Sequence, residues 1–274
     1  MSLALKALLR PLFKLLMLLL VALLMLQLYF VGRIALMAIS ATESTAFQRS
    51  EIYRVVSTSG ALKWSQRWVP YAQISVNLKR AVIASEDASF TEHDGLDLEA
   101  LEKAWGKNAV AEQRAQKQAD RIAADIAKRQ QGKKSSIFSA APTPPKLLTN
   151  GPKIIGGSTI TQQLAKNLFL SGERTLLRKS EELVLTLLLE AILNKQRILE
   201  IYLNNVEWGE GIFGAEAAAQ HYFRKPASRL TPYEAARLAV MLPRPRYFET
   251  RPNSDYLASR ANTIVARMGG VDVP

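Results

Sequence analysis

A long apolar run near the N-terminus is the feature that most restricts how this chain can fold. From Leu15 to Val31, Gln27 is the only strongly polar side chain, and after a two-residue break the chain is apolar again from Ile34 to Ile39. A helix rises about 1.5 Å per residue, so the first run spans about 26 Å and the whole about 37 Å, which brackets a hydrocarbon core of about 30 Å. We therefore predict a transmembrane anchor at residues 15–40.

The charges before this run indicate its orientation. Lys6, Arg10 and Lys14 precede it, and no acidic residue accompanies them. This pattern predicts a cytoplasmic tail at residues 1–14 and places the rest of the chain on the outer face of the membrane. A cleaved signal peptide is the alternative, because Ala38-Ile39-Ser40 loosely resembles a cleavage site. The apolar run is longer than the usual signal core of about 7–15 residues, which favours an uncleaved anchor.

The charge balance points to an anionic partner. The 274 residues include 36 Lys and Arg against 24 Asp and Glu, a formal net charge of +12. Nucleic acid, an acidic membrane surface and a phosphorylated substrate would all fit that charge. An exported domain rarely meets nucleic acid, so we do not expect nucleic acid as a partner. The chain has no cysteine, which excludes disulfides, thiolate catalysis and cysteine-based metal sites.

Beyond the anchor the pattern predicts a mainly α domain at residues 78–274, after a juxtamembrane segment at 41–77. We expect a short extended piece at residues 54–56. Apolar residues at helical spacing then predict one strong helix from Thr175 to Leu193, with a broad apolar face that includes Leu183, Val184 and Leu187. Further helices are predicted at 159–170, 195–203, 213–222, 231–242 and 254–268. Leu98, Leu101 and Trp105 begin another apolar stripe.

A basic insertion at residues 106–153 interrupts this domain. It holds ten Lys or Arg, three Asp or Glu and four prolines. Its first half, to about Gln131, can form a polar helix, and the second half, from Gly132, has the composition of a loop. Two interpretations remain open: a solvated insertion, or a contact with anionic lipid beside the anchor.

Three constellations carry candidate chemistry, and the first is Glu86 with Asp87 at the end of an apolar helix. A carboxylate at the edge of apolar packing tends to have a raised pKa, as a general acid or base near neutral pH requires. The alternative is a solvated or capping acidic pair. His93 follows nearby, where it could be a ligand or could orient a loop by hydrogen bonding.

The second constellation is the glycine pair that ends at Gly157, followed by a helix that begins near Thr159. Free backbone N–H groups at a helix start are a natural seat for phosphate, and ordinary capping is the alternative. Gln163 and Lys166 follow on nearly the same helical face. The segment lacks the Gly-Lys-Ser/Thr end of a P-loop.

The third constellation is Arg174, Arg178 and Glu182, spaced i, i+4 and i+8 on one helical stripe with Lys179 beside it. Two arginines and a lysine could hold a pyrophosphate, with Glu182 positioning them or sharing in acid–base work. Ordinary surface ion pairs are the alternative, although the apolar stretch at 183–189 favours the edge of a cleft.

In this order the three segments resemble the peptidoglycan glycosyltransferase family, the transglycosylases of the lysozyme-like fold. The resemblance continues through residues 195–204, 211–223 and 230–236 and covers roughly residues 78–247. It implies a bilobed, lysozyme-like domain behind one membrane helix, in the monofunctional form of the enzyme. The long basic insertion is a departure from the family, whose members usually have a short connection there.

The resemblance implies an inverting displacement in which lipid II is polymerised into β-1,4-linked glycan and undecaprenyl pyrophosphate leaves. Glu86 would be the general base, and Glu182 would assist the leaving group or fix its basic partners. The residues that would bind substrate or shape the motifs are Asp87, Phe90, His93, Gly156, Thr159, Gln163, Lys166, Arg174, Arg178 and Lys179.

The same resemblance implies a location in the bacterial inner membrane and no required cofactor, with no metal site assigned and a stimulating divalent cation left open. The expected partners are lipid II and the growing glycan strand, membrane lipids, and other proteins of cell-wall synthesis or division. Two rival functions remain: a lysozyme-like hydrolase that uses Glu86 as general acid, and an inactive cell-wall scaffold. The basic residues from Lys166 to Lys179 argue against a hydrolase, because a neutral glycosidic leaving group needs none.

Overall fold

The computed structural model describes residues 3–42, 44–132, 157–170 and 175–274 of the chain. It divides into two compact units, each described by itself. One consists of Met1–Leu96 with Thr159–Pro274, and the other is Asp97–Ser158. The described part of the predicted insertion, residues 106–132, belongs to the second unit.

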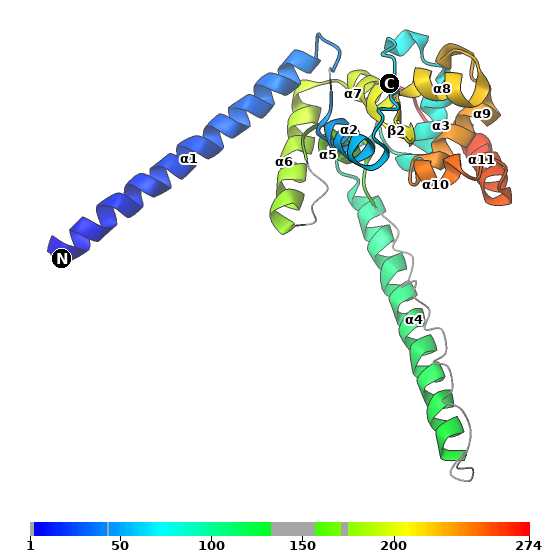
Figure 1. Cartoon of the computed structure of the whole chain (residues 1–274), viewed down its shortest axis with the longest axis horizontal. Helices are drawn as coiled ribbons and strands as arrows, with labels where there is room; N and C mark the ends of the chain where they lie inside the picture. Colours follow the sequence, from blue (N-terminus) through cyan, green and yellow to red (C-terminus); the bar gives the residue numbers. More distant parts are fainter. Residues whose placement is uncertain (1–2, 43, 133–156, 171–174) are drawn as a thin grey trace. The chain divides into compact units, whose positions relative to one another are not determined.

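The first unit is mainly α-helical with a small sheet (Figure 1). Its helices are α1 (Leu3–Met37), α2 (Ala46–Ser59), α3 (Val76–Glu86), α5 (Ile160–Phe169), α6 (Leu176–Ile192), α7 (Lys195–Asn205), α8 (Ala215–Phe223), α9 (Pro232–Met241), α10 (Pro245–Glu249) and α11 (Asp255–Arg267). Short 3₁₀ turns lie at Tyr71–Gln73, Ala227–Arg229 and Met268–Gly270. The strands β1 (Ser65–Gln66), β2 (Glu207–Gly209) and β3 (Ile212–Phe213) pair in the order β1-β3-β2, with β1 parallel and β2 antiparallel to β3.

The hydrophobic core lies where α3 packs against α9 and α11 and where α5 packs against α6 and α7. Among its fully buried side chains are Trp208, Tyr202, Phe90 and Leu78. The indole N–H of Trp208 donates to the backbone carbonyl of Leu238 at 3.0 Å, so its polar atom is satisfied inside the core. This packing holds the ends of α3, α5 and α7 in place.

The predicted helices at 159–170, 175–193, 195–203, 213–222, 231–242 and 254–268 all form, with ends within two residues of the prediction. The expected extended piece at 54–56 is wrong, because these residues lie in the middle of α2. Thr45 and Gln48 form a capping box at the start of α2, and Gly60 ends it in a left-handed conformation. These two caps specify a helix although its apolar pattern is weak.

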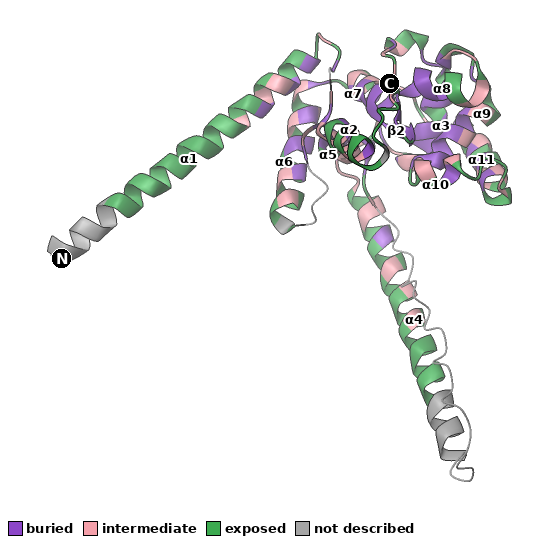
Figure 2. Cartoon of the chain, in the orientation of Figure 1, coloured by how far each residue is buried: buried purple, intermediate pink, exposed green. Residues whose placement is uncertain are grey.

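The anchor helix α1 contains an apolar segment, Pro11–Met37, that is long and apolar enough to cross a membrane. Most of α1 is exposed (Figure 2), but Phe30, Ile34 and Met37 near its end are buried in the core of the unit. The ring of Phe30 contacts that of Phe169 edge-on, with centroids 5.3 Å apart. The stretch from Pro11 to Tyr29 rises about 28 Å, close to the thickness of a hydrocarbon core. The last turns of α1 therefore belong to the domain.

Arg197 on α7 fastens the end of this helix. Its Nε donates to the carbonyl of Met37 at 2.8 Å, and its Nη2 donates to the carbonyl of Ser40 at 2.5 Å. The guanidinium thereby satisfies the carbonyl of Met37, one of those that a helix C-terminus leaves unpaired, and adds a favourable charge there. Helix α1 is thereby fixed to the unit that carries α3 and α5.

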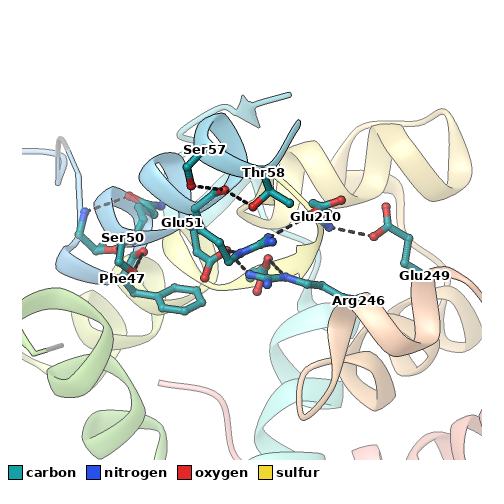
Figure 3. Close-up of polar contacts among 12 residues, drawn as sticks. Phe47, Ser50, Glu51, Ser57, Thr58, Glu210, Arg246 and Glu249 are labelled. Carbon is teal, nitrogen blue, oxygen red and sulfur yellow. Dashed lines mark hydrogen bonds and ion pairs between the residues drawn. The ribbon is translucent and has the colours of Figure 1, made fainter. Parts of the chain in front are cut away.

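A polar network joins α2 to β2 and α10 (Figure 3). Arg246 pairs with Glu51 and donates from Nε to Glu207 at 2.8 Å. Arg54 pairs with Glu51 at 2.8 Å and with Glu210 at 2.9 Å. Because both arginines remain partly exposed, each pair contributes little by itself, and the network mainly fixes the direction of α2.

Gly211, between β2 and β3, cannot carry a side chain without distortion. Its φ is +73°, and a Cβ there would lie 2.0 Å from the backbone carbonyl oxygen of Lys63. We expect Gly211→Ala to lower the free energy of unfolding by at least about 2 kcal/mol, because a left-handed conformation costs a non-glycine residue about 1–2 kcal/mol and the clash adds to it. Thermal unfolding of the full-length protein in detergent would measure the change. Gly270→Ala is the matched control, since a Cβ there meets nothing within 4 Å; equal melting temperatures would contradict the prediction.

The second unit is built on α4 (Leu98–Gly132). The polar helix predicted to about Gln131 is confirmed, and the predicted loop lies, apart from Gly132, outside the described residues up to 153. Of the apolar stripe, Leu101 is half-buried, whereas Leu98 and Trp105 are 70% and 67% exposed. The helix α4 therefore carries an exposed aromatic side chain, that of Trp105, near its start.

Candidate active site

Glu86 is the last residue of α3, at the point where a buried apolar helix reaches the protein surface. The preceding residues from Ala81 to Ala84 are buried, and Glu86 itself is half-buried. Its Oε2 accepts a hydrogen bond from Nε2 of Gln163 at 3.0 Å, and its Oε1 accepts one from the hydroxyl of Ser85 at 3.5 Å. The carboxylate is thus held from two sides while remaining accessible.

The surroundings of Glu86 raise its pKa, as the sequence predicted. Burial is the main cause, and it outweighs the hydrogen bonds from Gln163 and Ser85, which lower the pKa. The charge of Asp87 raises it further, and that of Arg260 on α11 lowers it. A carboxyl group tuned in this way can take a proton near neutral pH more readily than an ordinary glutamate.

Asp87 faces inward and ties the loop after α3 to the start of α5. Its Oδ2 accepts the backbone N–H of Ile160 at 2.9 Å, and its Oδ1 lies 2.8 Å from Nε2 of His93. The N–H of Gly95 donates to Nδ1 of His93 at 3.1 Å, so the ring proton sits on Nε2 and points to Asp87. These bonds suit the second of the two roles that the sequence left open for His93, the orientation of the loop.

The start of α5 is occupied by the protein's own groups. Thr159 and Gln162 form a capping box, and the Thr159 hydroxyl donates to the carbonyl of Gly95 at 2.7 Å. With the N–H of Ile160 bound to Asp87, two of the N–H groups expected to seat a phosphate are already used. These two N–H groups therefore take part in ordinary helix capping, the alternative to a phosphate site. Gly156 lies outside the described residues.

Phe90 is fully buried beneath this loop and is held by a lysine that we did not place among the site residues. The ammonium of Lys195 lies 4.6 Å from the centroid of the Phe90 ring and donates to the carbonyl of His93 and, at 2.8 Å, to Glu190. Such a cation–π contact with a paired lysine fixes both partners. The signal available in the sequence was the position of Lys195 at the first residue of a predicted helix, which does not reveal this contact.

Glu182 on α6 gathers the second set of predicted residues. It is only 4% exposed, and its carboxylate lies 2.5 Å from Nζ of Lys179 and 3.5 Å from Nη1 of Arg178. Nε of Arg178 is buried and has no hydrogen-bond partner among the described residues. Arg174 lies outside them. The predicted stripe of α6 is therefore a cluster of cations around one buried carboxylate.

The charges of Glu182 and Glu86 both act on Lys166. Although the residue as a whole is exposed, neighbouring protein removes water from its ammonium, and this desolvation lowers its pKa. Glu182 and Glu86 both act on it in the opposite direction, whereas Arg178 and Lys179 lower the pKa further. The charges of both predicted catalytic carboxylates thus act on one cation. The cations Lys166, Arg178 and Lys179 also outnumber the one carboxylate, Glu182, in their cluster.

Comparison with known proteins shows the family of the chain. The model of the Transglycosylase family matches residues 54–137 and 135–269. A biosynthetic peptidoglycan transglycosylase of Burkholderia thailandensis is 46% identical over 248 residues, or 90% of this chain and 82% of the relative. Proteins of the same name from Burkholderia pseudomallei and Herminiimonas arsenicoxydans are 45% and 43% identical over 90% and 92% of this chain, and over 82% and 92% of their own lengths. The expected mainly α, lysozyme-like fold behind one apolar helix is thereby confirmed, and the chain belongs to the transglycosylase family.

Proposed function

We propose that this transglycosylase polymerises lipid II into β-1,4-linked glycan strands, with undecaprenyl pyrophosphate as the leaving group. The observation that carries the proposal is the pairing of a half-buried glutamate whose pKa is raised with a neighbouring cluster of cations. A glycosyl transfer that expels a diphosphate needs a base at one end and positive charge at the other. Family membership and the names of the relatives support the same reaction.

In this reaction Glu86 takes the proton of the acceptor sugar's 4-hydroxyl as that oxygen attacks the anomeric carbon of the donor. The bond from that carbon to the pyrophosphate oxygen breaks with its electron pair, and the configuration inverts in one displacement. Lys166, Arg178 and Lys179 stabilise the departing diphosphate, and Glu182 keeps the last two in place. Nε of Arg178, which has no hydrogen-bond partner in the part of the chain that the structure describes, is suited to such an anion.

The remaining predicted residues divide by their contacts. Asp87, Phe90, His93 and Thr159 bond mainly to other parts of the protein, so we assign them the shaping of the site. Gln163 bonds directly to Glu86 and shares a face of α5 with Lys166. We propose no required cofactor, since protein cations can balance the diphosphate charge. A divalent cation would act as an additional stimulant.

We further propose a single-pass protein of the bacterial inner membrane, with its N-terminus in the cytoplasm and α3 to α11 outside. The basic residues before the anchor support this orientation. On α6, which contacts α1, the apolar side chains of Leu183, Val184 and Leu187 are 39–48% exposed. An apolar face beside an anchor suits contact with membrane lipids and with the lipid tail of the substrate.

The test is to supply purified full-length protein in detergent with lipid II and to separate the products by size. We expect glycan polymer and free undecaprenyl pyrophosphate. A second reaction supplies preformed glycan in place of lipid II. Shortening of that glycan without polymer formation would support the lysozyme-like hydrolase instead, and no reaction with either substrate would support the inactive scaffold.

The pH dependence of polymerisation should carry the signature of Glu86. Burial raises its pKa, and a general base must be ionised to accept a proton, so activity is full above the raised pKa and lost as pH falls through it. We expect the acidic midpoint to lie above the ordinary glutamate value of about 4.3. Initial rates measured between about pH 4 and pH 8, with folding checked at each pH, would locate it. A midpoint at or below the ordinary value would contradict the assignment.

A further inference from the structure

Tyr202 lies at the end of a hydrogen-bonded chain that reaches Glu86. Its side chain is fully buried in α7, and its hydroxyl donates to Oε1 of Gln163 at 2.9 Å. Nε2 of the same amide donates to Oε2 of Glu86 at 3.0 Å. Three helices, α7, α5 and α3, therefore contribute one residue each to a single line of donors and acceptors.

The chemistry of the three groups fixes the direction of this line. An ionised carboxylate only accepts hydrogen bonds, so the amide must turn its NH₂ group toward Glu86. Its carbonyl then faces Tyr202, which has a hydroxyl proton to donate. In the flipped amide the carbonyl oxygen would face the carboxylate and repel it. The hydrogen bond from the tyrosine hydroxyl stabilises the amide orientation in which the NH₂ group faces the ionised Glu86. Neighbouring hydrogen bonds in such a chain strengthen each other.

We propose that Tyr202 is a positioning residue that keeps Glu86 ionised by locking the orientation of the Gln163 amide. The proposal rests on the proposed function only in taking Glu86 as the base. The lock itself is a property of the resting protein and can be tested without substrate.

The phenol of Tyr202 stays protonated over the pH range in which Glu86 titrates. Burial, and then the negative charges of Glu86 and Asp87, raise the pKa of the Tyr202 phenol well above its usual value, so it remains a donor. The charged groups that act on Glu86 from neighbouring elements are Asp87 beside it, Arg260 of α11 and Lys166 of α5. The proposed role of Tyr202 requires no change in the charge of any of these groups.

Removing the hydroxyl should therefore raise the pKa of Glu86. Tyr202→Phe keeps the buried ring but leaves the Gln163 carbonyl without its donor, so the amide can turn its oxygen toward Glu86. A carbonyl beside the carboxyl group favours the protonated form, and the bond from Gln163 that lowered the pKa is weakened. We expect an upward shift of about half to one pH unit.

Two readouts on the full-length protein in detergent test this. The carbonyl band of protonated Glu86, identified in infrared spectra by difference from Glu86→Gln, is followed against pH in wild type and in Tyr202→Phe. The acidic limb of lipid II polymerisation is measured in parallel. We expect both midpoints to move up in Tyr202→Phe. The rate should fall about three- to tenfold at pH values below the midpoint and much less above it.

Two further variants separate positioning from general damage. Tyr222→Phe removes a hydroxyl that donates at 2.7 Å to the carbonyl of Trp208, outside this chain of bonds, and should leave both midpoints unchanged. Gln163→Leu should raise the infrared midpoint as Tyr202→Phe does, and combining the two changes should shift it no further, because both act through one amide.

The outcomes separate the two proposals. An unchanged infrared midpoint in Tyr202→Phe, an equal shift in Tyr222→Phe, or full additivity with Gln163→Leu would overturn the lock. If wild type forms no polymer while the infrared midpoint still shifts, the proposed function fails and the lock stands.

Discussion

Glu86→Gln should reduce lipid II polymerisation by at least about 100-fold while leaving the protein folded. General base catalysis contributes about 10²–10⁴-fold, and an amide cannot accept the proton of the attacking hydroxyl. The replacement has nearly the same shape, and its carbonyl oxygen can still accept the hydrogen bond from Gln163. The loss should therefore fall on kcat, with little change in the melting temperature.

Glu92→Gln is the matched control for this experiment. It makes the same chemical change six residues away, at an exposed position of the loop that follows α3. Its rate should stay close to that of wild type. Polymerisation by Glu86→Gln at the wild-type rate would remove Glu86 from the mechanism, and an equal loss in both variants would point to a general effect of charge.

Glu182→Gln should lower kcat by about 100-fold through a different route. The buried carboxylate pairs with Lys179 and Arg178, and without its charge neither cation keeps its position. Displacing a catalytic group by about 1 Å can cost about 10²-fold in rate. Removing a negative charge also makes the cluster more positive, so binding of an anionic substrate should not weaken. We therefore expect kcat to fall while KM stays constant or decreases.

The adjacent Glu181→Gln supplies the control, because it changes the net charge equally at a less buried position of α6. Steady-state rates across lipid II concentrations would separate kcat from KM. If Glu182→Gln kept kcat and only tightened binding, the cluster would act by its net charge alone, and the positioning role of Glu182 would be wrong.

Local signals in the sequence were sufficient for most helices of the first unit. Thr231 and Glu234 form a capping box at the start of α9, with Pro232 in its first turn, and these neighbouring residues account for the helix predicted at 231–242. The sequence predicted neither the short helix α10 nor α2, where capping residues specify a helix that hydrophobic periodicity did not reveal. Periodicity detects helices that bury one clear face, and α2 has only a weak one.

The apolar face of α6 shows a second limit of sequence patterns. Leu183, Val184 and Leu187 predicted a broad apolar face, yet these side chains are exposed and the buried face carries Leu185, Leu189 and the carboxylate of Glu182. A pattern identifies apolar residues but does not say whether protein or membrane covers them.

The sequence by itself determined the long apolar helix at the N-terminus, the bounds of six later helices to within two residues, and the place of Glu86 at the end of an apolar helix. Each of these depends on residues close together in the chain, where helical spacing and capping chemistry act. Only the tertiary structure decided that Asp87 occupies the start of α5, 73 positions away, and that Tyr202 holds Gln163 across 39. Such contacts depend on how α3, α5 and α7 pack in three dimensions, and local spacing along the chain does not encode which polar groups that packing brings together.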